Sequence, residues 1–158
     1  MLRLVPMTQA EFDAFIEISM RDQAQGQVQA GYLRAEQADE VIKKQREQFL
    51  PDDAATPNHF FFTIEDKDSA KAGGLWYTVA EQDGKRQFFV IDIQVFDKYR
   101  RRGYGTQAFE MMEEKAREMG ITTISLHVFK HNHSARAMYE KLGYVGTGKE
   151  MSKELVVN

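Results

Sequence analysis

Residues 91–106 read IDIQVFDKYRRRGYGT and join two patterns of different period. The first half carries apolar, β-branched residues at every second position, which favours a strand. After Gly105, apolar residues such as Ala108 and Met112 recur at helical spacing. Where a strand turns through glycines directly into a helix, free backbone N–H groups converge and the helix dipole adds positive charge. This junction predicts a phosphate site.

The loop in this stretch suits a ligand with several phosphates. Lys98 and the three arginines at 100–102 gather cations on an otherwise acidic chain. Gly103 and Gly105 lack the β-carbons that would keep a pyrophosphate away from the backbone. The third glycine of a dinucleotide-binding fingerprint is missing, as is the Gly-Lys-Ser/Thr of a Walker loop. The alternative interpretation is an ordinary tight turn with solvated arginines.

The chain begins with a strand pattern and two helical patterns. Residues 2–6 alternate as a strand, and Thr8 with Glu11 matches a capping box at the start of a helix. This first helix is expected to bury Phe12, Phe15, Ile16 and Met20. The polar stretch Gln23–Gln29 separates it from a second helix over residues 38–49, which a proline ends. The second helix places Ala38, Val41, Ile42, Gln45 and Phe49 on one side.

Three strands are then expected as an antiparallel meander. The runs 59–64, 75–79 and 87–96 are rich in aromatic and β-branched residues, and Asp83-Gly84 is a hairpin turn signal. The aromatic residues of the first two strands are Phe60, Phe61, Phe62, Trp76 and Tyr77. We expect them in the core rather than on a base-stacking surface.

The second half of the chain alternates helices and strands. The helix that Gly103 opens closes at Gly120, a residue favoured after a C-cap, and residues 121–128 alternate as a strand. Asn132 is a good N-cap for a further helix, before an extended run and a last strand near 151–156. The order β-α-α-β-β-β-α-β-α-β-β predicts an α/β (α+β) fold with a mixed central sheet.

The amino-acid composition and net charge limit the kinds of protein that this chain can be. The 158 residues, of which 42% are hydrophobic, predict a single domain over residues 1–158. A formal net charge of -3 argues against general binding to nucleic acid or to an anionic membrane. The sequence has no cysteine, which suits a reducing compartment, and its first residues lack the apolar run of a signal peptide or membrane span. A cytoplasmic protein is expected.

Two segments resemble the motifs of the GNAT superfamily of acyl-CoA-dependent N-acetyltransferases. Arg100, Gly103 and Gly105 fill that family's Gln/Arg-x-x-Gly-x-Gly/Ala loop. Its second motif is matched by Asn132, Ala135, Met138, Tyr139, Lys141, Gly143 and Tyr144, with tyrosine in place of the usual last phenylalanine. The chain looks most like small, stand-alone bacterial members. The resemblance implies parallel, splayed fourth and fifth strands, acetyl-CoA as acyl donor, and an acceptor that is a primary amine of a small molecule or peptide.

The resemblance also implies where the cofactor binds. A bulge near Ile93 to Phe96 would splay the strand, so that main-chain groups of Ile93 and Val95 bind the pantetheine arm like an added strand. The loop would hold the pyrophosphate, and Asn132 would add a polar contact. The expected cofactor-binding set is Ile93, Val95, Arg100, Arg101, Arg102, Gly103, Tyr104, Gly105, Thr106 and Asn132.

Three residues are candidates for catalysis. Tyr139 occupies the family position of the general acid for the leaving sulfur, although a helical tyrosine otherwise packs in a core. An amine with a pKa near that of lysine, about 10.4, must lose a proton before it attacks. Strand alternation places Asp92 opposite Ile91 and Ile93, and His127 opposite its own apolar neighbours. Either side chain is a candidate base, and a water relay is the alternative.

The sequence also fits functions other than acetyl transfer. The same fold could serve as a non-catalytic acyl-CoA-binding module or sensor, and residues 98–102 could bind another polyanion. An enzyme that uses a longer acyl-CoA would differ only in the part of its cleft beyond the pantetheine arm. His131 and His133 lack a third soft ligand nearby, so no metal is expected. The last strand could pair with another subunit, so the chain is expected to be a monomer or a homodimer.

Overall fold

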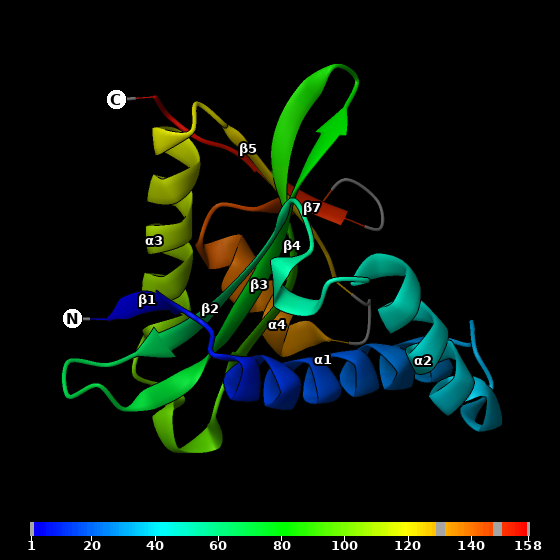
Figure 1. The fold of residues 1–158 in the computed structure, drawn as a ribbon. Coiled ribbons are helices and arrows are strands. Elements are labelled where there is room, and N and C mark those ends of the chain that lie inside the picture. Colours follow the sequence, from blue (N-terminus) through cyan, green and yellow to red (C-terminus); the bar gives the residue numbers. More distant parts are fainter. Residues whose placement is uncertain (1, 129–131, 147–149, 158) are drawn as a thin grey trace.

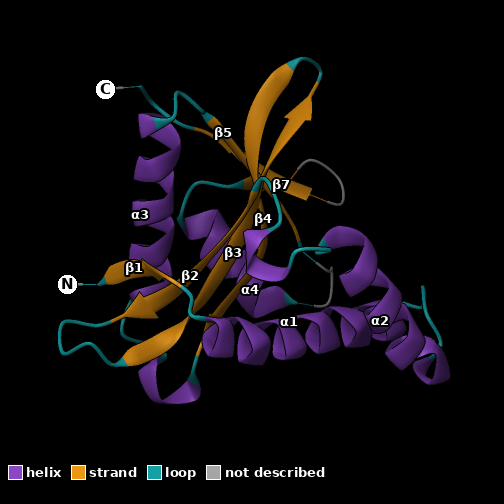
Figure 2. Ribbon diagram, in the orientation of Figure 1, coloured by secondary structure: helices purple, strands orange, loops and turns teal. Residues whose placement is uncertain are grey.

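The computed structural model of the protein describes residues 2–128, 132–146 and 150–157. Its strands are β1 (Arg3–Pro6), β2 (His59–Glu65), β3 (Lys71–Gln82), β4 (Lys85–Val95), β5 (Thr123–His127), β6 (Val145–Gly146) and β7 (Glu150–Glu154). Its α-helices are α1 (Gln9–Gln29), α2 (Ala38–Phe49), α3 (Tyr104–Glu118) and α4 (His133–Lys141). Short 3-10 helices lie at Ala35–Gln37, Asp53–Ala55 and Asp97–Tyr99. The order of strands and α-helices is the predicted one (Figure 2).

The strands form one mixed sheet in the order β1-β2-β3-β4-β5-β7-β6. β4 and β5 are parallel, as expected, and the other neighbouring strands pair antiparallel. Asp83 (φ 55°) and Gly84 (φ 76°) close the β3–β4 hairpin in the left-handed conformation that such a turn requires. The sequence therefore predicted both the meander and its turn.

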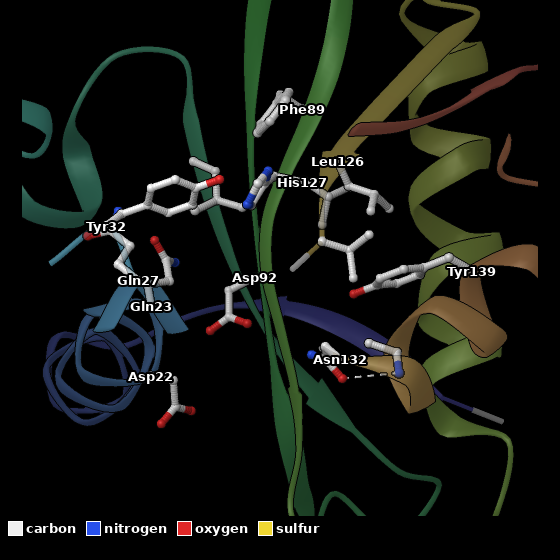
Figure 3. Close-up of a pocket in the computed structure, with 14 residues that line it drawn as sticks. Asp22, Gln23, Gln27, Tyr32, Phe89, Asp92, Leu126, His127, Asn132 and Tyr139 are labelled. Carbon is white, nitrogen blue, oxygen red and sulfur yellow. Dashed lines mark hydrogen bonds between the residues drawn. The ribbon is translucent and has the colours of Figure 1, made fainter. Parts of the chain in front are cut away.

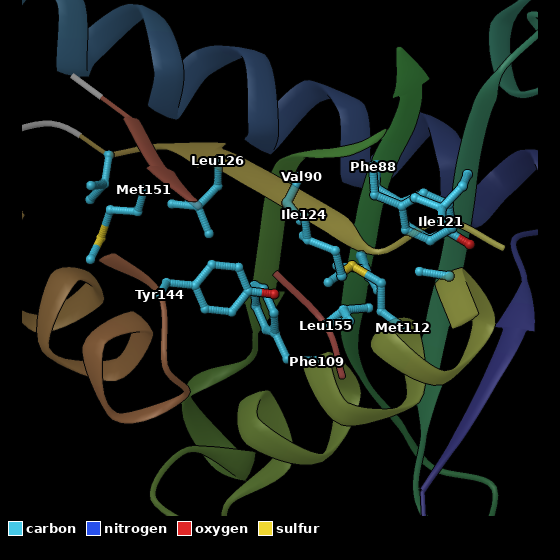
Figure 4. Close-up of a cluster of buried hydrophobic side chains, with 14 residues drawn as sticks. Phe88, Val90, Phe109, Met112, Ile121, Ile124, Leu126, Tyr144, Met151 and Leu155 are labelled. Carbon is cyan, nitrogen blue, oxygen red and sulfur yellow. The ribbon is translucent and has the colours of Figure 1, made fainter. Parts of the chain in front are cut away.

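Helices cover both faces of this sheet (Figure 1). On the face of α3 and α4, the core includes Phe88, Val90, Phe109 and Met112 (Figure 4). On the face of α1, a second cluster joins Phe12, Phe15, Ile16 and Met20 to Phe61 and Trp76. The prediction that the strand aromatics form core is confirmed, because Phe61, Trp76 and Tyr77 are buried while Phe60 and Phe62 pack against the core.

The first helix is longer than its sequence predicts. Its capping box forms as expected, since Thr8 Oγ1 accepts from the Glu11 main chain at 3.1 Å and Glu11 Oε1 accepts from the Thr8 main chain at 2.9 Å. The predicted break at Gln23–Gln29 is wrong, because these residues are the last turns of α1. Buried Ala24 continues the packed side of the helix, so the helix stays against the sheet despite its polar sequence.

The second helix has the predicted bounds, and four of the five residues predicted on its inner side are partly buried, with Phe49 as the exception. Phe49 is 57% exposed, whereas Leu50 is only 2% exposed. Leu50 leaves the helical conformation (φ -128°, ψ 59°), and this turn brings its side chain inward in place of Phe49. Within the described ranges, no helix is long and apolar enough to cross a membrane.

Candidate active site

The parallel pairing of β4 and β5 is short. It joins Phe88–Val90 to Ile124–Leu126 and ends there. At the same point, Trp76 of β3 pairs with Asp92 and Tyr77 pairs with Val90, so Ile91 is an extra residue without a partner. An extra residue bends its strand, which explains why β4 leaves β5 beyond Val90. The splay is confirmed, but the bulge lies at Ile91 and not within the predicted Ile93–Phe96.

The bulge also corrects the predicted faces of β4. Ile91 packs in the cluster of α1, and Asp92 accepts a hydrogen bond from Ser19 of the same helix. Ile93 packs on the opposite face, against the core of α3. The expectation that Ile91 lies opposite Asp92 is therefore wrong, because a bulge places two consecutive side chains on one face.

Beyond the bulge, β4 has main-chain groups that face away from β3. Phe96 donates its N–H to the carbonyl of Ala72 at 2.8 Å. Since such bonds recur at alternate residues of an antiparallel pair, the N–H and C=O groups of Ile93 and Val95 point to the other side, into the gap beside β5. Arg100 Nε donates to the carbonyl of Val95 at 2.8 Å, which leaves the Val95 N–H at this edge.

The glycine loop has the conformation of an anion site. Gly103 is the N-cap of α3 with φ 76°, and Arg101 is also left-handed with φ 64°. The first helical bond of α3 runs from Gln107 N–H to the Gly103 carbonyl, so the preceding amides of the turn have no acceptor within the helix. A β-carbon on Gly105 would lie 3.2 Å from Met138 Sδ, so glycine allows α3 to pack closely on α4.

The basic residues of the loop have different surroundings. Arg100 Nη1 lies 2.9 Å from Asp97 Oδ1, so its side chain braces the loop. The Lys98 ammonium and the Arg102 guanidinium lie 5.6 and 5.8 Å from the ring centre of Tyr99. That ring stacks on Tyr104 with 6.1 Å between centres. The exposed cations are thus held around an aromatic pair at the start of α3.

A cavity of about 500 Å³ opens where β4 leaves β5. Asp92, His127, Asn132 and Tyr139 all line it, so the structure brings the three predicted catalytic residues together with one predicted cofactor contact. Figure 3 shows Asp92 and Tyr139 on either side of the β4 ribbon. Residues 100–106 lie at the other end of the splay and do not line this cavity.

Asp92 is a mostly buried carboxylate held by two side-chain hydrogen bonds. Gln94 Nε2 donates to its Oδ2 at 3.2 Å, and the Ser19 hydroxyl adds a second hydrogen bond. Burial raises the pKa of Asp92 above its ordinary value despite these bonds, and the charge of Asp22 adds to the rise. A carboxylate of raised pKa holds a proton more firmly than an exposed aspartate does.

Tyr139 projects from α4 toward the same space. Its ring packs on Phe109 and Tyr144, with centres 5.5 and 6.3 Å away. Burial raises the pKa of Tyr139 to about 12, and the negative charge of Asp92 contributes to that rise. The phenol therefore keeps its proton at neutral pH and can donate a hydrogen bond.

The remaining predicted residues lie at the rim of the cavity or outside it. Asn132 Oδ1 accepts from the Ala135 N–H at 3.3 Å, so this residue caps α4, as expected, and also lines the cavity. His127 is exposed at the end of β5 and pairs in register with Glu150 of β7. Of the histidines considered for a metal, His133 begins α4 and His131 lies outside the described residues.

The end of α1 forms a wall of the cavity that the sequence pattern did not predict. Asp22, Gln23 and Gln27 line it, with Tyr32 just beyond the helix, and the two glutamines fall in the stretch expected to be a polar break. A signal was present, because Ser19, Gln23 and Gln27 follow one another at intervals of four residues along the same side of the helix. A packed helix side that turns from apolar to polar indicates that a cavity has replaced the core.

Known proteins resemble this chain along almost its whole length. The sequence model of the Acetyltransferase (GNAT) family matches residues 15–144. The Bacillus subtilis N-acetyltransferase YycN is 32% identical over 154 residues, which are 98% of this chain and 99% of YycN. The Bacillus subtilis N-acetyltransferase YdgE is 30% identical over 152 residues, which are 96% of this chain and 97% of YdgE.

Solved structures agree in fold. The crystal structure of YycN from Bacillus subtilis matches with a TM-score of 0.87 at 32% identity, over 99% of both chains. The PaiA N-acetyltransferase of Thermoplasma acidophilum, solved in complex with coenzyme A, has a TM-score of 0.65 at 16% identity, over 98% of this chain and 99% of its own. The second likeness is one of fold alone. Taken with the family match, these relatives establish that the chain is an acetyltransferase and belongs to the GNAT family.

Proposed function

We propose that the protein transfers an acetyl group from acetyl-CoA to a primary amine of a small molecule or peptide, by direct attack of the amine. The observation that carries this proposal is the cavity at the β4–β5 splay. There a carboxylate of raised pKa, Asp92, and a protonated phenol, Tyr139, line one space beside a strand edge that can accept another extended chain.

The cofactor would bind along the splay. Acetyl-CoA supplies the acetyl thioester, and the PaiA structure, which was solved in complex with coenzyme A, supports coenzyme A as a ligand of this fold. The main chain of Ile93 and the N–H of Val95 would bind the pantetheine arm. The amides of residues 101–106 would bind the pyrophosphate at the start of α3, with the exposed arginines of the loop around it. Asn132 would contact the cofactor while it caps α4.

Asp92 is the base in this proposal. The acceptor enters mostly as an ammonium ion and must lose a proton before its nitrogen can attack. The raised pKa of Asp92 brings the carboxylate closer to the amine in basicity, which favours proton transfer. Ser19 and Gln94 hold the carboxylate in place from the side of α1. His127 lines the same cavity and is the rival base that the experiments must separate from Asp92.

Tyr139 would stabilise the departing sulfur. Its pKa of about 12 lies above that of an ordinary thiol, about 8.5. A phenol of this kind does not lose its proton permanently to a thiolate. It donates a hydrogen bond to the sulfur as negative charge develops there, and solvent supplies the proton of the released thiol.

Titration calorimetry with acetyl-CoA tests the cofactor site. Gly103→Glu places a negative side chain where the phosphates would lie. Gly84→Glu is a matched control, because Gly84 has the same φ of 76° and also meets no crowding, but lies in the β3–β4 turn. We expect micromolar binding by the wild type and Gly84→Glu and its loss in Gly103→Glu. Equal binding by both variants, or no binding by folded wild type, would contradict the proposal.

Turnover tests the chemistry. Release of the coenzyme A thiol is followed while primary amines of different types are added. Acetylated amine, identified by mass spectrometry, is the expected product. Binding of acetyl-CoA without acetylation of any amine would contradict the proposed transfer and would favour a binding module.

A further inference from the structure

The described residues that line the cavity include two carboxylates and neither lysine nor arginine. Fourteen residues line it, and all of them belong to the described part of the chain. Asp22 and Asp92 are acidic, whereas neither lysine nor arginine occurs among these described lining residues. Since the cavity walls restrict the access of water, the two carboxylates attract a cation more strongly than they would on an open surface.

Asp22 is the more informative of the two carboxylates. It lies on α1, is exposed, and makes no ion pair or hydrogen bond with any residue that the structure describes. Its neighbours behave differently, since Asp13 pairs with Arg46 and Asp39 pairs with Arg21. The charge of Asp22 instead acts on Asp92, which is also acidic. Two like charges, with neither lysine nor arginine among the lining residues that the structure describes, suit a ligand that supplies the positive charge itself.

Aromatic rings complete this wall. Tyr32, which is 70% exposed, and Phe89 both line the cavity, and Figure 3 shows Tyr32 on the same side of it as Gln23 and Gln27. Aromatic faces attract ammonium groups, and side-chain amides accept hydrogen bonds from them. Among its described residues, the wall therefore offers several groups that bind a cation and neither lysine nor arginine to bind an anion.

From this arrangement we infer that the acceptor is a diamine or polyamine, with a second ammonium group beyond the nitrogen that is acetylated. This inference rests on the proposed transfer reaction. The reacting nitrogen lies near Asp92, while Asp22 holds the second ammonium on the same cavity. The nitrogen forms a bond to the acetyl carbon, the carbon–sulfur bond breaks, the thiolate leaves, and the nitrogen's proton passes to Asp92.

The same charges disfavour other amines. An amino acid places a carboxylate close to its amine, so Asp22 and Asp92 would repel it. A monoamine meets no repulsion, but it leaves Asp22 unpaired. Acceptors of equal chain length should therefore differ in rate according to the charge at their far end.

Three acceptors of similar length separate these cases. Cadaverine ends in a second ammonium, pentylamine in a methyl group and ε-aminocaproate in a carboxylate. We expect kcat/KM for cadaverine to exceed that for pentylamine by about fivefold at low salt, with ε-aminocaproate the poorest, because a single partly exposed ion pair contributes a factor of this size. Added salt should reduce the difference.

Variants assign the preference to Asp22. Asp22→Asn should reduce the advantage of cadaverine over pentylamine about fivefold, chiefly through a higher KM for cadaverine. Asp22→Lys should invert the order of cadaverine and ε-aminocaproate. Glu17→Gln is the matched control, since Glu17 lies on the same helix, is exposed and does not line the cavity. It should leave all three acceptors unchanged.

The outcomes separate this inference from the proposed function. Acetyl-CoA binding, measured by calorimetry, should be equal in wild type, Asp22→Asn and Asp22→Lys. If binding and acetylation are normal but pentylamine or ε-aminocaproate matches cadaverine, the inference fails and the proposed function stands. If Asp22→Asn and Glu17→Gln change the preference equally, it also fails. Failure of acetylation with every amine overturns both.

Discussion

The carboxylate of Asp92 and the phenol of Tyr139 act on each other across the gap between β4 and β5. Both line the cavity, and the negative charge of Asp92 contributes to the high pKa of Tyr139. The bulge at Ile91 turns Asp92 toward α1 just where β4 leaves β5, so Asp92 and Tyr139 face the cavity from opposite sides of β4. The geometry of the pair therefore depends on a backbone irregularity.

Tyr139→Phe should lower kcat about 100-fold, the usual effect of losing one hydrogen-bond donor to developing charge. Binding of acetyl-CoA should not change, because the ring remains against Phe109. With a pKa of about 12, Tyr139 keeps its proton through mildly alkaline pH, so the wild-type rate should show no loss from this group there. Steady-state kinetics over pH are the measurement. A variant with normal kcat would rule out the role.

Asp92→Asn should lower kcat/KM about 100-fold and remove the acidic limb of its pH profile. A base acts in its ionised form, and burial raises the pKa of Asp92, so this limb should lie above the range of an exposed aspartate. His127→Gln provides the comparison and should keep the limb. Loss of the limb in His127→Gln alone would transfer the assignment to the histidine.

The same Asp92→Asn change should stabilise the protein at neutral pH. Because its pKa is higher in the folded chain than in the unfolded chain, the folded state binds more protons between the two values, and stability falls as pH rises through this window. The ionised carboxylate thus lowers stability at neutral pH, and asparagine removes that effect. Thermal unfolding should give a higher Tm for the variant near neutrality and no gain in acid. An unchanged Tm at neutral pH would contradict this.

Lys153→Met should destabilise the fold by about 3 kcal/mol, since removing one partner leaves a buried charge unpaired. Lys153 Nζ lies 3.1 Å from both carboxylate oxygens of Glu113, which is 3% exposed. The Tyr144 hydroxyl donates to the same carboxylate at 3.2 Å, which gives a role to the tyrosine that departs from the family's phenylalanine. Urea unfolding gives the free energy.

Lys85→Met is the control for that measurement. The ion pair of Lys85 with Glu154 is exposed on both sides, so its loss should cost well under about 1 kcal/mol. Equal losses in the two variants would show that the Glu113 carboxylate is not stabilised by Lys153.

His59 should make stability depend on mildly acid pH. Trp76 Nε1 donates to His59 Nδ1 at 3.0 Å, so the imidazole must be neutral at that atom. Burial lowers the pKa of His59, so the unfolded chain takes up a proton first as pH falls below the ordinary value, about 6.5, and stability declines. Fluorescence of the single tryptophan reports unfolding. His59→Gln should remove this decline, and an equal decline in the variant would refute the prediction.

Local chemistry made much of the fold predictable. The Asp83-Gly84 turn, the capping box of Thr8 with Glu11 and the glycine-opened start of α3 each depend on a few adjacent residues, and all three form as expected. The site was harder to predict from the sequence, because its geometry depends on the register between β3 and β4. Where β4 bulges is decided by its pairing with β3, so the position of Ile91 and the face of Asp92 could not be predicted from alternation.

The polar end of α1 was missed for a related reason. Sequence periodicity identifies a helix by its apolar side, and that signal disappears where the helix leaves the core and lines a cavity. Gln23 and Gln27 remain helical because Ala24 still packs beneath them. Their place in the cavity wall becomes apparent only in the folded chain, where residues of β4 and β5 line the same cavity.

The two ends of α1 have different surroundings. Phe12, Phe15 and Ile16 anchor the helix on the sheet, whereas Asp22, Gln23 and Gln27 face the cavity. On the proposed function, substitutions in the last turns should alter acceptor choice while the anchoring turns keep the helix in place. Such a division allows a lineage to acquire new substrates through a few changes at one end of a helix, without remaking the cofactor site.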